Sequence, residues 1–142
     1  MSKPESFVKR LEDVKPEAWS DARGRLSFHT LVSADLTPSN GLVAGVSTVP
    51  PGGALATHAH AQPEIYFALE GQAVVTIAGV ERVVSAGATV FIPGDALHSI
   101  ANPFDQAFRI FYVFPADRFD EIKYKFASPL LIGEGGISRR GD

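Results

Sequence analysis

The stretch Gly52-Gly-Ala-Leu-Ala-Thr-His58-Ala-His60-Ala-Gln-Pro-Glu64-Ile-Tyr66-Phe-Ala-Leu-Glu-Gly71 carries the strongest signal in this 142-residue sequence. His58 and His60 are two positions apart, a spacing that directs both imidazoles to one face of an extended strand. Glu64 follows His60 by four residues. Two nitrogen donors on one face, with a carboxylate nearby, suit a single metal ion, although an isolated His-x-His in a strand is more often incidental.

The composition limits the donors that such a site can use. The chain has no cysteine, and its four histidines are His29, His58, His60 and His98. The absence of cysteine excludes a disulfide scaffold, a thiolate zinc site, an iron–sulfur cluster and a cysteine nucleophile. His98 belongs to a separate strand candidate, after a Pro-Gly-Asp turn. Three neutral imidazoles and a carboxylate favour Fe, Mn, Ni, Co or Zn over Ca or Cu(I).

Short apolar or alternating segments recur on both sides of this stretch, each ended by glycine or proline. The strand candidates cover residues 26–32, 41–49, 64–70, 72–78, 80–84, 89–92, 97–101 and 108–114. Such spacing predicts an all-β fold, an antiparallel sandwich or a small barrel. We expect one domain over residues 1–142, with its core at about 26–114 and a loose tail at about 133–142. Short helical segments are expected near 16–21 and 116–121.

The charge pattern excludes several classes of partner. The net charge is −3, and no basic stripe of the kind that binds nucleic acid is present. No run approaches the roughly 18 apolar residues of a membrane span. The first 13 residues are rich in charge and lack the apolar core of a signal peptide. We therefore expect a cytoplasmic protein with neither nucleic acid nor membrane as a partner.

Two groups of residues resemble the paired signatures of the cupin superfamily. The first is the quoted stretch, and the second comprises Gly87, Pro93, Gly94, His98 and Asn102. One departure is Asp95, which stands where the family usually has a glycine. The resemblance implies a single-domain cupin, a small antiparallel β-barrel or jelly roll with one divalent transition metal ion in its mouth. The ligands that it implies are His58, His60, Glu64 and His98.

Most of the chain is similar to the small single-domain cupins that cleave dimethylsulfoniopropionate to dimethyl sulfide and acrylate. The similarity is carried by residues 17–20, 39–49, 51–53, 63–66 and 111–124. It implies a metal-dependent carbon–sulfur lyase that acts on a small carboxylate substrate, with active-site tyrosines at Tyr66 and Tyr124. Tyr66, beside the metal ligands, is the expected base, and Tyr124 is expected to orient the substrate or share the proton.

Two other functions use the same ligand set. One is an Fe(II)-dependent dioxygenase of a small organic substrate, because the metal would keep open coordination positions. The other is a cupin that binds a metabolite and is not an enzyme. Under the lyase hypothesis the sulfonium cation rests on an aromatic face, and the candidates are Trp19, Phe28, Phe91 and Phe111.

Three further expectations concern residues to which the signatures give no role. His29 is expected to be an ordinary strand residue, and Arg118 the partner of a salt bridge in the second helical segment. Apolar positions on the outer side of one strand favour a homodimer, and these are Ile65, Phe67 and Leu69.

Overall fold

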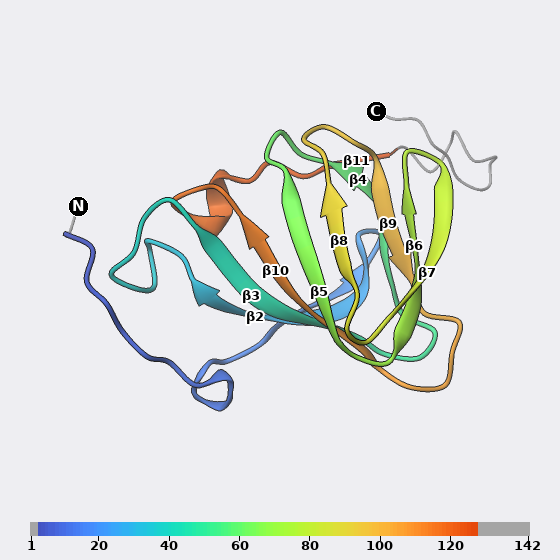
Figure 1. Cartoon of the computed structure of the whole chain (residues 1–142), viewed down its shortest axis with the longest axis horizontal. Helices are drawn as coiled ribbons and strands as arrows, with labels where there is room; N and C mark the ends of the chain where they lie inside the picture. Colours follow the sequence, from blue (N-terminus) through green and yellow to red (C-terminus); the bar gives the residue numbers. More distant parts are fainter. Residues whose placement is uncertain (1–2, 128–142) are drawn as a thin grey trace.

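The computed structural model describes residues 3–127, in which one antiparallel sheet curls into a half-barrel (Figure 1). Its elements within these residues are η1 (Leu11–Asp13), β1 (Glu17–Asp21), β2 (Gly24–Val32), β3 (Val43–Val49), β4 (Ala54–Ala59), β5 (Glu64–Glu70), β6 (Gln72–Ile77), β7 (Val80–Ser85), β8 (Thr89–Ile92), β9 (His98–Ala101), β10 (Phe108–Phe114), η2 (Phe119–Glu121) and β11 (Lys125–Phe126). The strand order is β7-β6-β9-β4-β2-β3-β10-β5-β8, with β1 paired to β2 and β11 to β4. The all-β prediction is confirmed.

The helical segments differ in part from the prediction. The segment expected near residues 16–21 is wrong, because Glu17–Asp21 forms β1 and pairs with β2. This pairing places Trp19 edge-on against Phe28, with ring centroids 5.3 Å apart, and such packing outweighs a weak local helix signal. The 3₁₀ helix η2 falls within the second predicted segment. The predicted loose tail lies outside the described residues. No helix among residues 3–127 is long and apolar enough to cross a membrane.

Alternation along β5 and β10 gives this part of the sheet an inner and an outer face. In β5, Glu64, Tyr66 and Ala68 are buried, while the residues between them are exposed. The same alternation in β10 turns Tyr112 inward, where its ring lies over Gly45 of β3. A Cβ at Gly45 would lie within 2.7 Å of ring carbon Cζ, so only glycine leaves room for this ring.

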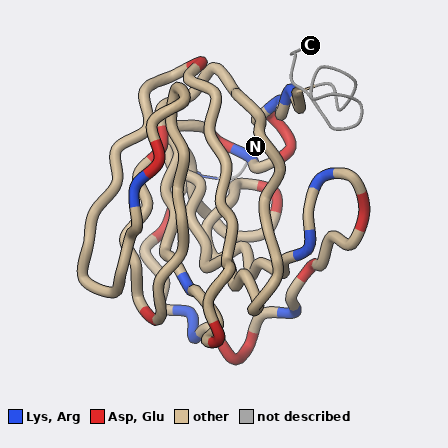
Figure 2. Tube along the Cα trace, turned by 90° about the vertical axis from the view of Figure 1, so that its right-hand side faces the viewer, with Lys and Arg blue, Asp and Glu red and all other residues tan. Residues whose placement is uncertain are grey.

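Charged side chains lie mainly at the ends of the strands and in the N-terminal segment, as Figure 2 shows. Lysine and arginine alternate there with aspartate and glutamate, and the trace of the long strands is almost free of either sign. The long strands of the sheet therefore carry few charged side chains.

Backbone hydrogen bonds hold the two signature segments together at both ends. The Gly52 N–H donates to the Asn102 carbonyl at 2.7 Å, and the Asn102 N–H donates back to Gly53 at 3.0 Å. At the other end, the Asp95 N–H donates to the His60 carbonyl at 2.7 Å. Asp95 has φ +66°, so it adopts the left-handed conformation that glycine usually supplies, and the turn is preserved.

Gly71 and Gly79 provide a matched pair for testing the tightness of these turns. Both have positive φ, +73° and +82°. A Cβ at Gly71 would lie 2.2 Å from the Ala107 carbonyl oxygen, whereas nothing lies within 4 Å of one at Gly79. We predict that Gly79→Ala lowers the free energy of unfolding by about 1 kcal/mol through backbone strain alone. Gly71→Ala should lower it by about 3 kcal/mol or more, because the backbone must also move. Urea unfolding measures both, and equal losses would contradict the prediction.

Candidate metal centre

Three of the four histidines meet on the inner face of the sheet. His58 lies on β4, His60 directly follows that strand, and His98 begins β9. Each side chain is at most 1% exposed. One nitrogen from each lies within 4.8 Å of the others, and His58 and His98 are direct partners in the β4–β9 register. These three buried histidines could hold one metal ion.

A local irregularity in β4 sets the direction of His58. The β4–β9 register shifts between Leu55 and His58, so both residues are buried although they are three positions apart. Such a bulge changes the phase of a strand and re-aims the side chains beyond it. From His58 onward the ordinary alternation holds, and His60 is buried on the same side, as its spacing predicts.

Each histidine is oriented by a hydrogen bond to the backbone. The three Nδ1 atoms lie 2.8 to 2.9 Å from carbonyl oxygens, which are those of Ala56, Gln62 and Ala96. Because a carbonyl only accepts, Nδ1 carries the proton and Nε2 is left with its lone pair. The Nε2 atoms of His58 and His98 are buried without a hydrogen-bond partner. Buried, unpartnered imidazole donors fit a divalent transition metal ion.

The carboxylate of Glu64 lies against this cluster. Glu64 is 4% exposed on the inner face of β5. Its Oε1 lies 3.2 Å from Nε2 of His60 and 3.5 Å from Nε2 of His98. The structure thus brings together the four residues predicted as ligands, and their coordination of a metal stays a prediction.

Burial lowers the pKa of a histidine of the site and raises the pKa of its two tyrosines. Burial, together with the neighbouring His98, lowers the pKa of His58 well below its usual 6.5, so this imidazole stays neutral, as a ligand must be. Burial and the Glu64 charge raise the pKa of both Tyr66 and Tyr124 well above 10. The two phenols are therefore protonated at neutral pH unless a cation offsets these effects.

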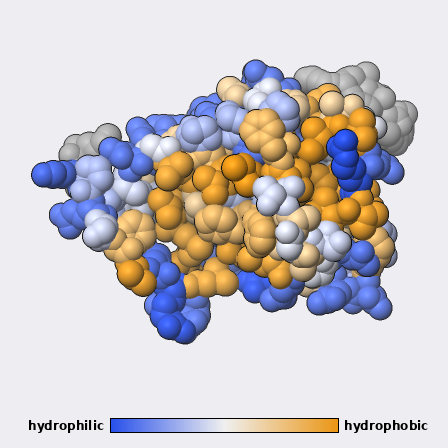
Figure 3. All heavy atoms as spheres, viewed as in Figure 1, coloured by the Kyte–Doolittle hydropathy of each residue, from blue (hydrophilic) through white to orange (hydrophobic). Residues whose placement is uncertain are grey.

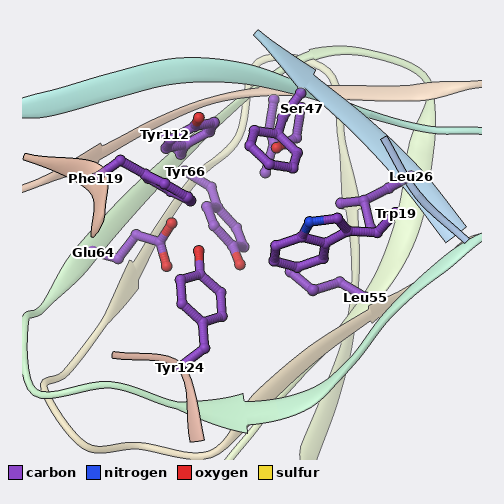
Figure 4. A pocket seen from close by; sticks show the side chains of 11 residues that line it. Trp19, Leu26, Ser47, Leu55, Glu64, Tyr66, Tyr112, Phe119 and Tyr124 are labelled. Atoms are coloured by element: carbon purple, nitrogen blue, oxygen red, sulfur yellow. The ribbon is translucent and has the colours of Figure 1, made fainter. Parts of the chain in front are cut away.

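A narrow pocket that is partly open to solvent reaches Glu64 and Tyr124, both of which contact the histidine cluster. Figure 4 shows the hydroxyls of Tyr66 and Tyr124 and the Glu64 carboxylate pointing toward the same space, with the Trp19 indole across from them. Tyr124 is carried there by the segment leading to β11 and stacks on His58, with ring centroids 4.8 Å apart and planes 15° from parallel. Both predicted catalytic tyrosines thus line the pocket.

Four aromatic residues were candidates for contact with a sulfonium group, and two of them line this pocket, Trp19 and Phe28. The prediction was wrong for Phe91 and Phe111, which do not line the pocket. They are 63% and 36% exposed, because alternation in β8 and β10 directs them to the outer face.

Six residues that line the pocket were not predicted as site residues: Leu26, Ser47, Leu55, Ile110, Tyr112 and Phe119. Arg109 is polar and is therefore expected on the outer face of β10, so alternation from Arg109 places Tyr112 on the inner face. The apolar residues on both sides of Tyr112 make this pattern hard to recognise. Phe119 has no such local signal, because its position depends on how the chain returns across the barrel after Pro115.

Two expectations outside the signatures can also be compared with the structure. His29 lies on the outward phase of β2, opposite Val46, and does not join the histidine cluster. Arg118 forms the expected ion pair, with its guanidinium 2.8 Å from Asp120.

The chain is similar to known proteins over much of its length. A family model described as a cupin domain matches residues 45–114. The dimethylsulfoniopropionate lyase DddW of Ruegeria pomeroyi is 36% identical over 106 residues, which are 74% of this chain and 68% of that protein.

Solved structures share the fold. A cupin-2 domain from Rhodospirillum rubrum has a TM-score of 0.73 at 21% identity, and the match covers 89% of this chain and 83% of that one. A predicted oxalate decarboxylase from Thermotoga maritima has a TM-score of 0.70 at 25% identity, covering 78% of this chain and 99% of that one. The polyketide cyclase RemF of Streptomyces resistomycificus has a TM-score of 0.72 at 22% identity, covering 81% and 82%.

The metal content of histidine variants tests whether the three clustered histidines, and not His29, bind the metal. We predict that His58→Ala weakens the affinity for a transition metal by at least about tenfold, because one imidazole donor is lost. His29→Ala, which removes an imidazole from the outer face, should leave the affinity unchanged. Elemental analysis of both purified variants measures the difference, with circular dichroism to confirm folding. A folded His58→Ala protein with full metal content would remove His58 from the ligand set.

The depressed pKa of His58 predicts how the stability of the chelator-treated protein depends on pH. Below the unfolded-state pKa of about 6.5, the unfolded chain binds a proton at His58 that the folded chain does not. The free energy of unfolding should therefore fall as the pH decreases below about 6.5, by up to about 1.4 kcal/mol per unit. Urea unfolding across this range measures the slope. An identical slope in a folded His58→Gln variant would assign it to other groups.

Proposed function

The chain belongs to the cupin superfamily, and from this we propose that it is a metal-dependent lyase that cleaves dimethylsulfoniopropionate, or a similar small β-substituted carboxylate, to dimethyl sulfide and acrylate. The observation that carries the proposal is the convergence of the Tyr66 and Tyr124 hydroxyls beside a buried histidine cluster (Figure 4). A relative at 36% identity that is a lyase of this kind supports the substrate.

We propose that His58, His60, Glu64 and His98 hold the metal. The histidines offer unprotonated Nε2 atoms, and Glu64 adds a carboxylate at their side. When bound, a divalent ion supplies the positive charge that stabilises enolate-like charge on a substrate carboxylate and favours the phenolate of a nearby tyrosine. Its identity depends on availability as well as on these donors.

The pocket suits a small molecule that carries opposite charges at its two ends. We place the carboxylate of the substrate on the side of Tyr124, which stacks on His58, and the sulfonium cation against the aromatic wall of Trp19, Phe28 and Phe119. No lysine or arginine lines this pocket among the described residues, so no positive side chain opposes the cation. Arg23 lies outside it, with its guanidinium 4.2 Å from the centre of the Trp19 ring.

The reaction needs one proton acceptor. Tyr66, as phenolate, takes the proton from the carbon next to the substrate carboxylate. The electrons of that C–H bond form the carbon–carbon double bond of acrylate, and the carbon–sulfur bond breaks with its electron pair leaving on neutral dimethyl sulfide. Tyr66 is 2% exposed, so the transfer takes place away from bulk water. Tyr124, stacked on His58, orients the substrate or shares the proton.

Anaerobic incubation with dimethylsulfoniopropionate tests the activity directly. Protein loaded in turn with Mn, Fe, Ni and Zn should release dimethyl sulfide, measured by gas chromatography, with at least one of these metals. Turnover without oxygen separates the lyase from the dioxygenase that the same ligands would allow. Absence of dimethyl sulfide with all four metals would overturn the proposal.

The Tyr66→Phe variant tests the assignment of the base. It keeps the ring and removes only the hydroxyl, so metal content should be unchanged while kcat falls by at least about a hundredfold. Tyr124→Phe should cause a smaller loss, because its hydroxyl only assists. Metal analysis and rates on the same samples give both readouts. A Tyr66→Phe enzyme that retains its turnover would exclude Tyr66 as the base.

A further inference from the structure

Ser47 of β3 places a hydroxyl group in a part of the pocket that is otherwise apolar. It is 8% exposed and lines the pocket together with Leu26, Phe28 and Ile110 (Figure 4). The proposed ligands do not include it, and neither does the proton transfer. A polar group is costly to bury among apolar side chains, so a serine at this position needs a reason.

The strand register fixes the direction of Ser47. Every residue of β3 except Thr48 is buried, so burial alone does not show which side chains face inward. Ser47 lies opposite Phe28 on β2 and opposite Ile110 on β10, and both of these line the pocket. Side chains that are directly opposite each other lie on one face of a sheet. Ser47 therefore stands between two apolar side chains that offer its hydroxyl no hydrogen bond.

The carboxylate of the pocket lies elsewhere. Among residues 3–127, Glu64 is the acidic residue that lines the pocket, and its Oε1 lies 3.2 Å from Nε2 of His60. As a proposed ligand of the metal, it is not free to pair with a second cation. A sulfonium group on the aromatic wall would therefore meet neutral groups, which are the aromatic rings and the Ser47 hydroxyl.

The surroundings of this wall are apolar on the outer side as well. Figure 3 shows a broad band of hydrophobic atoms across the half-barrel, in the region of β10 and β5, where Phe67 and Phe111 are exposed. In such surroundings the dipole of a hydroxyl group acts more strongly on a nearby charge than it does in water.

We propose that Ser47 is a specificity-determining residue, whose hydroxyl oxygen recognises the cationic sulfonium group of the substrate and selects it over a neutral group of the same shape. This role rests on the proposed function, because the cation is that of the proposed substrate. The oxygen turns its partial negative charge toward the sulfonium and its polarised methyl groups. The small side chain leaves room for these methyl groups beside Phe28.

A neutral hydroxyl suits the change of charge during the reaction better than a carboxylate would. When the carbon–sulfur bond breaks, its electron pair moves to sulfur and the positive charge disappears. A carboxylate would stabilise the cationic substrate and then be left buried without a partner. A hydroxyl can rotate, so it presents its oxygen to the sulfonium and its hydrogen to the neutral sulfide, whose sulfur is a weak acceptor.

The binding of a cationic ligand and of its neutral isostere tests the proposal. Isocaproate has the shape and the carboxylate of dimethylsulfoniopropionate, but a CH group replaces the positively charged sulfur. Titration calorimetry on the metal-loaded Tyr66→Phe protein, in which turnover is suppressed, gives the two dissociation constants and their ratio. Adding Ser47→Ala should lower the preference for the cation by at least about fivefold. The affinity for isocaproate should stay the same or increase.

The neighbouring position of β3 provides a matched control. The Thr48 hydroxyl accepts a hydrogen bond from Nε of Arg109 at 3.1 Å and lies on the opposite face of the strand from Ser47. Thr48→Val should therefore leave the preference unchanged. Ser47→Thr and Ser47→Val add the same bulk, and only Ser47→Thr, which keeps a hydroxyl, should retain the preference. Circular dichroism confirms that each variant is folded.

The outcomes separate the role of Ser47 from the lyase activity. Wild-type protein that releases no dimethyl sulfide would overturn the lyase, while the binding preference and its dependence on Ser47 are still measured. Release of dimethyl sulfide together with an unchanged preference in folded Ser47→Ala protein would overturn only the role of Ser47. Binding of neither ligand to the Tyr66→Phe protein would overturn it as well.

Discussion

The register between β4 and β9 is the constraint on which the site depends. It makes His58 and His98 direct partners, and backbone hydrogen bonds hold it at both ends. At one end Gly52 donates to Asn102 and Asn102 donates to Gly53, and at the other end Asp95 donates to His60. A slip of one residue would turn a histidine to the outer face, because side chains alternate along a strand. The two signature segments therefore act as one unit that sets the positions of the donors.

The site that this unit builds with Tyr124 buries groups that are costly to bury. The Nε2 atoms of His58 and His98 have no hydrogen-bond partner, and burial works against a charge on His58, Tyr66 or Tyr124. A packed core would gain more from apolar residues at these positions. A cation in the cluster would offset the cost, since it gives the imidazoles a partner and favours phenolate, which supports the proposed metal-dependent chemistry over a purely structural role.

Local periodicity predicted which side chains of the site share a face of a strand, but it did not predict all of the elements around the site. It placed His58 and His60 on one face and Tyr66 inward with Glu64, because these depend only on alternation within one strand. It did not identify residues 17–21 as a strand, since that strand exists through its pairing with β2. Nor could it choose among Trp19, Phe28, Phe91 and Phe111 for the contact with a sulfonium group, because a run of apolar residues does not show which of them faces inward.

The sequence by itself determined the chemistry of the donors: without cysteine, and with three histidines and a glutamate at signature spacing, a metal in this chain would meet nitrogen and oxygen ligands. The tertiary structure alone decided that Trp19, Tyr112 and Phe119 enclose one pocket, and that Ile65 and Phe67 lie in one surface with Phe91 and Phe111 of the neighbouring strands. The physical reason is that donor identity and spacing are local properties of the chain. A pocket wall or a surface patch is assembled from strands distant in sequence, whose pairing and curvature no single segment encodes.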